Sequence, residues 1–350
     1  MNQPMDGMVR HPKREFLRSS REVVSCAGVL LAIACADPVP VASDTPIALG
    51  EPSGTFAEPF TRITSLRELA DGRMIVTDFV ERRIMVGRFD GSPAAPVGRR
   101  GPGPREWSSA RPIRALRGDT SLLVDAVARR WIRFVDTLVV GQISPDALVR
   151  RSIGSADDAD TLGNVYARQP LGDDPRDSIL VLRAALGDGK VDTLVMMRSQ
   201  TSLGPRGTDE EGNRLPVARP AFATGEEFAA FPDGWVAIAR LDPLRLDWIS
   251  PDGRRIDGTP VGEPPLPVTD AEKERVRAEN ASVIEFFGRA TGAIREVMLA
   301  PYTVFPDELP PFEPGALVAG GDGLAYLRRL EPVGMSGARY DVFDRAGRRV

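Results

Sequence analysis

Short apolar runs alternate with polar residues along most of the chain, and turn residues separate the runs. In residues 69–91, an Asp-Gly pair precedes one alternating pattern, and a second pattern follows it. The same order of turn and paired strand patterns returns about 48 residues later, at residues 116–136. An Asp-Gly pair supplies the left-handed backbone of a tight hairpin, and alternation turns one face of each strand toward a core. Both units therefore predict β-hairpins.

Three further units continue this pattern. Residues 231–253 and 321–347 repeat the Asp-Gly turns and the paired strand patterns. A weaker unit is assigned by its position, with its strands predicted at residues 163–167, 179–182 and 191–196 and a hairpin at Asp188-Gly189. Repeats of roughly 20 to 50 residues are typical of solenoids and propellers, and the spacing here matches a four-stranded blade. We therefore expect an all-β fold, a β-propeller over residues 47–350.

One segment departs from the repeat. Thr269 and Glu272 form a capping box, which places the start of a helix near Asp270. The helix has an apolar stripe at Val276, Val283, Phe287, Ile294 and Met298. We expect one amphipathic helix near 270–298, within an insertion at residues 267–314 that packs on the propeller and then loops back.

The repeated order of turn, strand and blade-linking loop, such as the loop at residues 98–107, resembles six-bladed β-propellers of the NHL-repeat type, particularly bacterial envelope proteins. The resemblance covers roughly residues 55–350 and implies six blades. Only five units are visible, and the chain ends directly after the turn at residues 344–347. Either strands before residue 60 complete the ring, or the sixth blade is incomplete or missing by truncation. We favour the second interpretation, in which an open ring exposes sheet edges.

The N-terminal region has the order of an export signal. Basic residues precede an apolar run at residues 23–34, which ends in small residues before Cys35. A helix of about 12 residues rises only about 18 Å, which is too short to span a bilayer. The residues around Cys35 resemble the lipobox of bacterial lipoproteins, although Ala32 stands where Leu is more usual. In the alternative, Cys35 is one more apolar residue of an ordinary signal peptide.

The lipobox resemblance implies that Cys35 is lipidated. We therefore expect a signal peptide at residues 1–34, a lipidated tether at residues 35–46, and a location in the bacterial cell envelope, on the periplasmic or outer-membrane side. The membrane is then a partner through the lipid anchor. The mature domain would contain neither histidine nor a free thiol, because His11, Cys26 and Cys35 all belong to the leader or the anchor. This composition excludes histidine-dependent serine triads and histidine-zinc sites from the domain.

Composition narrows the class of partner further. The net charge of −4 becomes more negative without the first 34 residues, which disfavours a nucleic-acid surface. Arginines gather near the first blade junction, and we take Arg99, Arg100 and Arg105 as candidate ligand-binding residues for an anion such as a sugar acid or a peptide carboxylate. Surface solubility is the alternative explanation for them.

Other polar clusters receive structural interpretations. The Gly-Pro repeat at residues 101–104 is interpreted as a blade-linking loop, because proline removes the amide donors that a phosphate cradle needs. Asp78 and Asp125 occupy equivalent places in two units and are expected to satisfy turn amides. The segment from Asp158 to Gly163 fails the EF-hand pattern, and an acidic turn at residues 173–177 is interpreted as solvated, with calcium coordination as the alternative. Tryptophans within the strand patterns are expected in the core.

Two functions remain open at this level. The first is a noncatalytic binding or scaffold module without a cofactor, which holds a peptide, glycan or protein partner on the propeller face and the inserted helix. The second is a metal-dependent hydrolase or lactonase, similar to gluconolactonase-type propellers, with Ca²⁺ held by carboxylates and an Asn in a central channel. We favour binding, because no set of Asp, Glu and Asn from several inner strands is recognisable.

Overall fold

The computed structural model describes residues 50–109, 112–125, 128, 130–143, 156–171, 178–198, 219–287, 302–335 and 337–350. Cys35, the predicted signal peptide and the tether lie outside these residues, as does the acidic turn at residues 173–177. Across the described ranges, no helix combines the length and the apolar character that a bilayer crossing requires.

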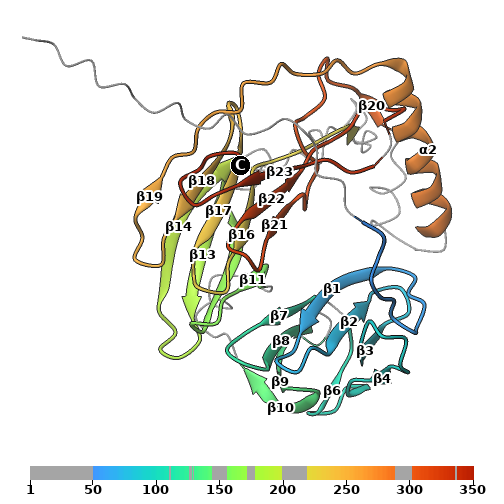
Figure 1. Cartoon of the computed structure of the whole chain (residues 1–350), viewed down its shortest axis with the longest axis vertical. Helices are drawn as coiled ribbons and strands as arrows, with labels where there is room; N and C mark the ends of the chain where they lie inside the picture. The colour runs from blue at the N-terminus through green and yellow to red at the C-terminus, as the bar shows by residue number, and fades with distance from the viewer. Residues whose placement is uncertain are drawn as a thin grey trace, which may run out of the picture. The chain divides into compact units, whose positions relative to one another are not determined.

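Five antiparallel sheets follow one another along the chain, and each is a simple up-and-down meander (Figure 1). Blade 1 contains β1 (Ile63–Glu68), β2 (Met74–Asp78), β3 (Arg83–Gly87) and β4 (Ala95–Pro96). Blade 2 contains β7 (Ile113–Ala115), β8 (Thr120–Asp125), β9 (Arg130–Val135) and β10 (Leu138–Ile143). Blade 3 contains β11 (Asp158–Ala159), β12 (Asn164–Pro170), β13 (Ser178–Ala185) and β14 (Val191–Arg198). Blade 4 contains β16 (Glu227–Ala230), β17 (Val236–Leu241), β18 (Leu244–Ile249) and β19 (Arg255–Ile256), and blade 5 contains β21 (Leu317–Ala319), β22 (Ala325–Arg328) and β23 (Tyr340–Phe343).

Two short parallel pairs lie outside the blades. Strands β5 (Arg99–Arg100) and β6 (Glu106–Trp107) pair within the link between blades 1 and 2, and β15 (Arg219–Pro220) pairs with β20 (Tyr302–Val304).

The blades pack in chain order through their first strands. Strand β7 contacts β1 and β11, and β16 contacts β11 and β21, so the first strand of each blade lies against the first strand of the next. Buried apolar clusters join each blade to its neighbour: Ile84 and Ile132 link blades 1 and 2, and Leu246 and Phe343 link blades 4 and 5. Sheets that meet along their inner strands and share cores with both neighbours form a β-propeller, which confirms the predicted all-β fold.

The number of blades differs from the six that the resemblance implied. The described residues form five blades, and the last has three strands. A single bridge between Phe343 and Arg349 stands where its fourth strand would pair. The backbone turns at Asp344, whose carboxylate accepts the N–H of Arg348 at 3.0 Å.

The predicted turns are observed. Gly72, Gly234 and Gly323 follow Asp in three blades and have φ of +79°, +84° and +83°, a region that disfavours side chains. The weak third unit is also confirmed, because its strands pair from Asn164 to Arg198, with one register shift between Val181 and Leu182 and a hairpin at residues 186–190.

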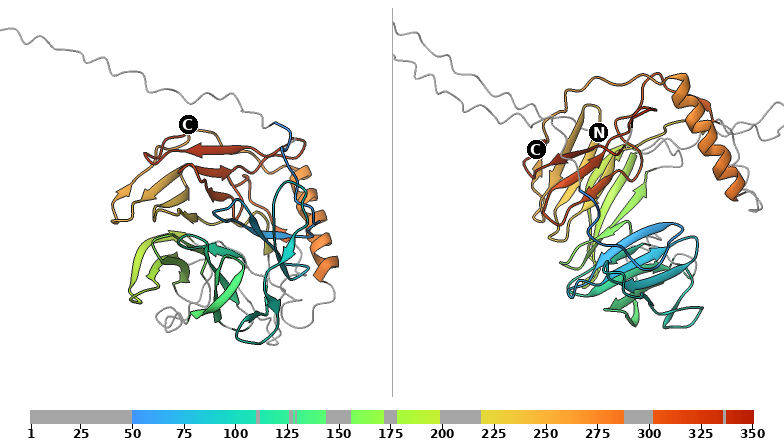
Figure 2. Two further views of the ribbon diagram at one scale, coloured as in Figure 1. Left: turned by 60° about the horizontal axis from the view of Figure 1, so that its bottom comes forward. Right: turned by 45° about the vertical axis from the view of Figure 1, so that its right-hand side comes forward.

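Helix α2 (Asp270–Phe287) begins where the capping box predicts. The hydroxyl of Thr269 bonds the Glu272 carboxylate, and the Glu272 N–H donates back to that hydroxyl at 3.4 Å. Val276 is buried, as the predicted apolar stripe requires. The predicted continuation to residue 298 lies outside the described residues. In both views of Figure 2, α2 (orange) lies beside the red, C-terminal part of the chain. Strand β20 contacts the helix.

Asp78 and Asp125 satisfy turn amides, as predicted from their equivalent positions. Asp78 is fully buried and accepts the N–H groups of Thr61, Arg62, Val80 and Glu81 at 2.7–3.3 Å. Burial opposes its ionisation, but these four donors outweigh burial and hold the pKa of Asp78 below its ordinary value.

We expect Asp78→Asn to destabilise the protein at pH 7, by about 1–3 kcal/mol, because an amide cannot accept from four N–H groups as a carboxylate does. A depressed carboxyl pKa contributes stability that is present above the unfolded pKa and is lost as pH falls through the folded pKa. The difference in the free energy of unfolding between the two proteins, measured with urea, should therefore become smaller from pH 7 to pH 3. A difference that stays constant with pH would contradict the role of Asp78 as an ionised acceptor of these turn amides.

Candidate functional site

Opposite charges gather where the first strands of blades 3 and 4 begin. Arg168 on β12 donates from Nη2 to Oε2 of Glu227 at 2.7 Å, and Glu227 begins β16 in the next blade. The backbone N–H of Arg168 donates to Asp157 Oδ2 at 2.7 Å, and the Phe228 ring centroid lies 4.9 Å from its guanidinium carbon. Arg168 therefore joins two carboxylates and a ring from two blades.

Burial makes two carboxyl groups of this region weaker acids. It raises the pKa of Glu227, although the Arg168 charge and the N–H of Gly315 oppose the shift. It also raises the pKa of Asp158, which faces the charge of Arg114. Asp158 accepts the N–H of Ala230 in blade 4 at 2.9 Å, so it too links neighbouring blades. Shifted carboxyl groups occur both at functional sites and in structural ion-pair networks.

The partners of these groups favour the structural role. Each carboxylate accepts from an arginine or from backbone N–H groups, which leaves few lone pairs for a ligand. Arg240 repeats the arrangement in blade 4, where it bonds Glu226 at 2.6 Å and Asp247 at 2.8 Å. In the part of the chain that the structure describes, no three acidic, His or Cys side chains are grouped closely enough to hold a metal ion.

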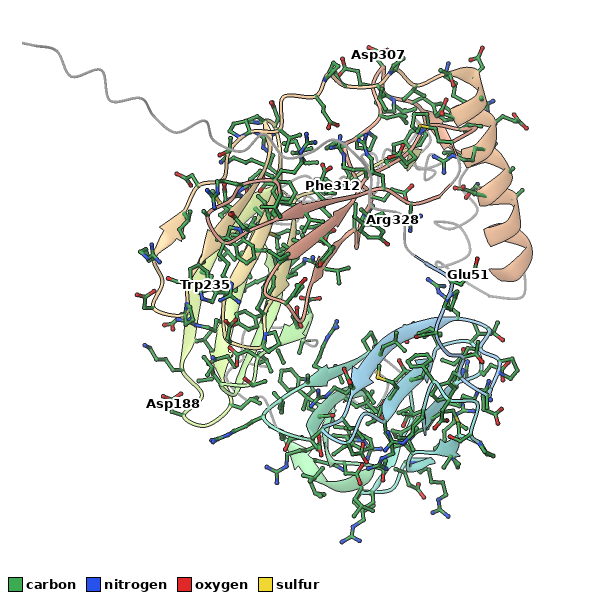
Figure 3. The ribbon with its side chains drawn as sticks, in the orientation of Figure 1. Glu51, Asp188, Trp235, Asp307, Phe312 and Arg328 are labelled. Carbon is green, nitrogen blue, oxygen red and sulfur yellow. The ribbon has the colours of Figure 1, made fainter. Side chains whose placement is uncertain are left out.

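A cavity of about 330 Å³ lies between α2 and the last blade. It is lined by Arg275 of α2, by residues 313–316 before β21, and by residues 328–335, 337 and 338 at the end of β22 and in the connection to β23. Its volume falls within the range of small-ligand pockets. Figure 3 labels Phe312, which is fully buried and directly precedes residues 313–316 of the lining. It also labels Arg328, an exposed residue at the end of β22.

One carboxylate fixes α2 to the wall of this cavity. Glu272 is only 2% exposed, and its Oε1 accepts the N–H of Val333 at 2.6 Å. Its other oxygen belongs to the capping box of α2. The start of the helix and the β22–β23 connection are therefore held as one unit around the cavity.

Arg329 is committed to the fold at the same place. It bonds Asp341 at 2.7 Å and Glu263 at 3.1 Å, and its Nε donates to the Pro311 carbonyl at 3.0 Å. Although Arg329 lines the cavity, its charge is neutralised by these partners.

The three arginines predicted as ligand residues lie in the link between blades 1 and 2, away from the cavity lining. Arg99, Arg100 and Arg105 are all exposed. Arg99 bonds Glu106 through Nε at 2.7 Å, and its side chain is 83% exposed. Within the described ranges, Arg99 is the one of the three that is paired, and its partner Glu106 is an acid of the same loop.

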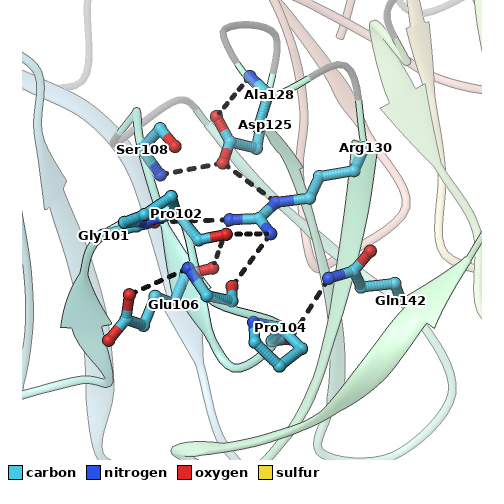
Figure 4. Close-up of polar contacts among 10 residues, drawn as sticks. Gly101, Pro102, Pro104, Glu106, Ser108, Asp125, Ala128, Arg130 and Gln142 are labelled. Carbon is cyan, nitrogen blue, oxygen red and sulfur yellow. Dashed lines mark hydrogen bonds and ion pairs between the residues drawn. The ribbon is translucent and has the colours of Figure 1, made fainter.

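The Gly-Pro loop at residues 101–104 is a blade link, as predicted, and Arg130 holds it in place (Figure 4). The guanidinium donates to the carbonyls of Gly103 and Glu106 at 2.9 and 2.8 Å and reaches those of Gly101 and Pro102. The loop therefore presents carbonyl oxygens inward. Because the N–H of Gly101 and of Gly103 are also already bonded, the loop has no free donors there for a phosphate.

The sequence analysis missed Arg168, Glu227 and Arg275. A signal for Glu227 exists, since a pair of acids stands at the start of the first strand in two units, at Asp157-Asp158 and at residues 226–227. No comparable signal marks Arg275, which is one of several charged residues on an exposed helix.

Comparison with known proteins adds no family. No protein-family model matches the chain, and no curated protein matches it either. Among solved structures, a protein of unknown function from Bacteroides thetaiotaomicron is 12% identical with a TM-score of 0.38, over 83% of this chain and 59% of that one. The chain thus spans less than two thirds of that protein.

Two further solved structures are similar at the same distant level. A calcium-binding protein, regucalcin, from Agrobacterium tumefaciens is 8% identical with a TM-score of 0.34, over 85% of this chain and 75% of that one. Virginiamycin B lyase from Staphylococcus aureus is 11% identical with a TM-score of 0.27, over 60% and 72% of the two chains. The propeller assignment rests on the strand pairing and the shared cores of this chain.

Proposed function

We propose that this chain is a noncatalytic binding module that takes its ligand in the cavity between α2 and the last blade. The observation that carries the proposal is the contrast between two arginine-rich regions. Arg168 and Arg240 are paired with carboxylates, whereas the cavity wall holds Arg275 and Arg328, which retain unused donors. Guanidinium donors without an acceptor in the wall of a concave site are a binding feature and need no catalytic group.

The cellular setting belongs to the same proposal. We propose that the module is anchored in the bacterial envelope through a lipid on Cys35, with residues 36–46 as a tether. The partner would be a peptide, a glycan or a protein that presents an anionic group to the cavity, and we retain Arg99, Arg100 and Arg105 as a secondary exposed contact for it.

The alternative, a metal-dependent hydrolase or lactonase, needs several free carboxylates or amides around one ion. The carboxylates that the fold gathers do not meet this need, because Glu227, Asp157 and Asp158 accept from Arg168 or from backbone donors. The residues present are a poor fit to the ion.

We expect added calcium to leave the melting temperature unchanged. A ligand that binds only the folded state stabilises it by mass action, so a bound ion would be visible in the melt. The measurement is thermal unfolding of the soluble domain with chelator and with micromolar to millimolar Ca²⁺, with Mg²⁺ as the matched control for ionic strength. A rise of several degrees at micromolar Ca²⁺ would overturn the noncatalytic proposal in favour of the hydrolase.

A further inference from the structure

We infer that the cavity between α2 and the last blade binds a small organic carboxylate, recognised by Arg275 and Arg328. The inference rests on the proposed binding function and names the ligand class of that same site. Its basis is the set of unused donors, the charge balance of the lining and the character of the remaining wall.

Arg275 is held in the wall with most of its donors unused. One ion pair joins its Nη1 to Glu279 at 3.0 Å, and the ring centroid of Phe222 lies 5.8 Å from the guanidinium carbon. Its Nε and Nη2 are buried and have no hydrogen-bond partner among the described residues. Buried donors are normally paired, so these two nitrogens lack an acceptor. A ligand in the cavity supplies this acceptor only if the guanidinium turns from its present position, because both nitrogens are buried in this structure.

Arg328 supplies the second, accessible guanidinium. It ends β22, lines the cavity, and its side chain makes no hydrogen bond or ion pair within the described part of the chain. A guanidinium offers a planar fork of N–H donors that matches the two oxygens of a carboxylate. Two such forks at one cavity favour an anion that accepts from both.

The charges around the cavity favour a single negative charge over a double one. Arg329 is neutralised by Asp341 and Glu263, and Glu331 lies 3.1 Å from Arg339. Among the charged residues of the lining, three arginines, Arg275, Arg328 and Arg329, stand against Glu313 and Glu331, which is a formal excess of one positive charge. A monoanionic carboxylate neutralises this excess, whereas a phosphate at close to two negative charges leaves part of its charge without a partner.

Part of the wall can contact a short apolar body attached to the carboxylate, although more of the exposed lining is polar than apolar. Apolar side chains line it at Pro314, Ala316, Leu330, Pro332, Val333 and Met335. Pockets of this kind use an apolar lining for affinity and a few polar groups for orientation. Both a free organic acid and the C-terminal carboxylate of a peptide have this chemistry.

The test uses N-acetyl-leucine as the carboxylate, N-acetyl-leucinamide as its uncharged match, and inorganic phosphate as the competing anion. Binding to the soluble protein is measured by isothermal titration calorimetry. We expect N-acetyl-leucine to bind at least tenfold more tightly than the amide and than phosphate. A longer acetylated peptide with a free C-terminus, compared with N-acetyl-leucine, separates a peptide source from a free acid.

Variants locate the binding. Arg275→Met and Arg328→Met should each weaken the binding of N-acetyl-leucine at least tenfold. Arg275→Lys should retain only part of the affinity, because lysine lacks the planar fork of donors. Arg277→Met is the matched control on α2, since Arg277 pairs with Glu274 at 3.5 Å and lies outside the cavity lining. Circular dichroism melts establish that each variant is folded, and Arg328→Met tests the site if Arg275→Met does not fold.

Equal binding of the acid and the amide, or tighter binding of phosphate, would overturn the carboxylate assignment and leave the cavity as a binding site. Binding that survives both arginine substitutions, or no binding of any probe at about 10 mM, would also overturn it. The calcium melts test the noncatalytic function separately, so the two failures are distinguishable.

Discussion

Trp248→Ala is expected to lower the free energy of unfolding by about 3–5 kcal/mol, as large-to-small substitutions of buried aromatic residues do. Trp248 is 0% exposed and lies in the cluster that joins blades 4 and 5. Its ring centroid is 5.0 Å from that of Phe231 and 6.1 Å from that of Trp235. Removal of the indole leaves a cavity between two blades, which the β-strands cannot close by a local shift. Urea unfolding at neutral pH measures the loss.

Two controls separate cavity formation from other effects of the substitution. The indole Nε1 of Trp248 is buried and has no hydrogen-bond partner among the residues that the structure describes, so Trp248→Phe removes an unpaired donor while it keeps most of the ring. We expect a smaller loss for it, of about 1–2 kcal/mol. Leu138→Ala on β10, at 70% exposure, should change stability by less than about 0.5 kcal/mol. A Trp248→Ala variant as stable as Leu138→Ala would contradict the shared core between blades 4 and 5.

Local chemistry explains why most of the blades were predictable. An Asp-Gly turn and an alternating strand are specified within about ten residues. The turn at Asp233-Gly234 and the apolar run of β17 are therefore recognisable without any knowledge of the partner sheet. The start of α2 is predictable for the same reason, because the Thr269–Glu272 capping box is complete within four positions.

The number of blades follows from longer-range properties. Whether another sheet follows blade 5 depends on packing against its outer face, and no local pattern encodes that contact. The family resemblance implied six blades, but residues 344–350 form a turn and one bridge instead of another strand pair.

The candidate site was largely unpredictable, again because its contacts are distant in sequence. Glu272 meets Val333 across 61 positions, and Arg168 meets Glu227 across 59. Arginine density along the sequence pointed to Arg99, Arg100 and Arg105. However, density does not distinguish an arginine that is exposed or already paired from one that lines a cavity with free donors.

Asp125→Ala is expected to cost about 3–5 kcal/mol, because it leaves the charge of Arg130 buried without its counter-ion. Asp125 is 0% exposed and accepts the N–H of Ser108 at 2.8 Å and the Nε of Arg130 at 3.4 Å. The Arg130 side chain is 13% exposed and holds the Gly-Pro link through carbonyls, so the loss should fall toward the lower end of this range. Urea unfolding of the variant measures the cost.

A double-mutant cycle shows whether the loss comes from the stranded charge. Asp125→Ala combined with Arg130→Met removes both charges, and the double variant should be more stable than the sum of the two single losses predicts, since the partners share one network. Arg99→Ala, in the exposed pair with Glu106 of the same link, should produce no measurable loss. Strict additivity of the two substitutions would mean that Asp125 acts through the amides of Ser108 and Ala128 and not through Arg130. Arg130 would then hold the Gly-Pro loop independently of it, through carbonyl oxygens that need no carboxylate beside them.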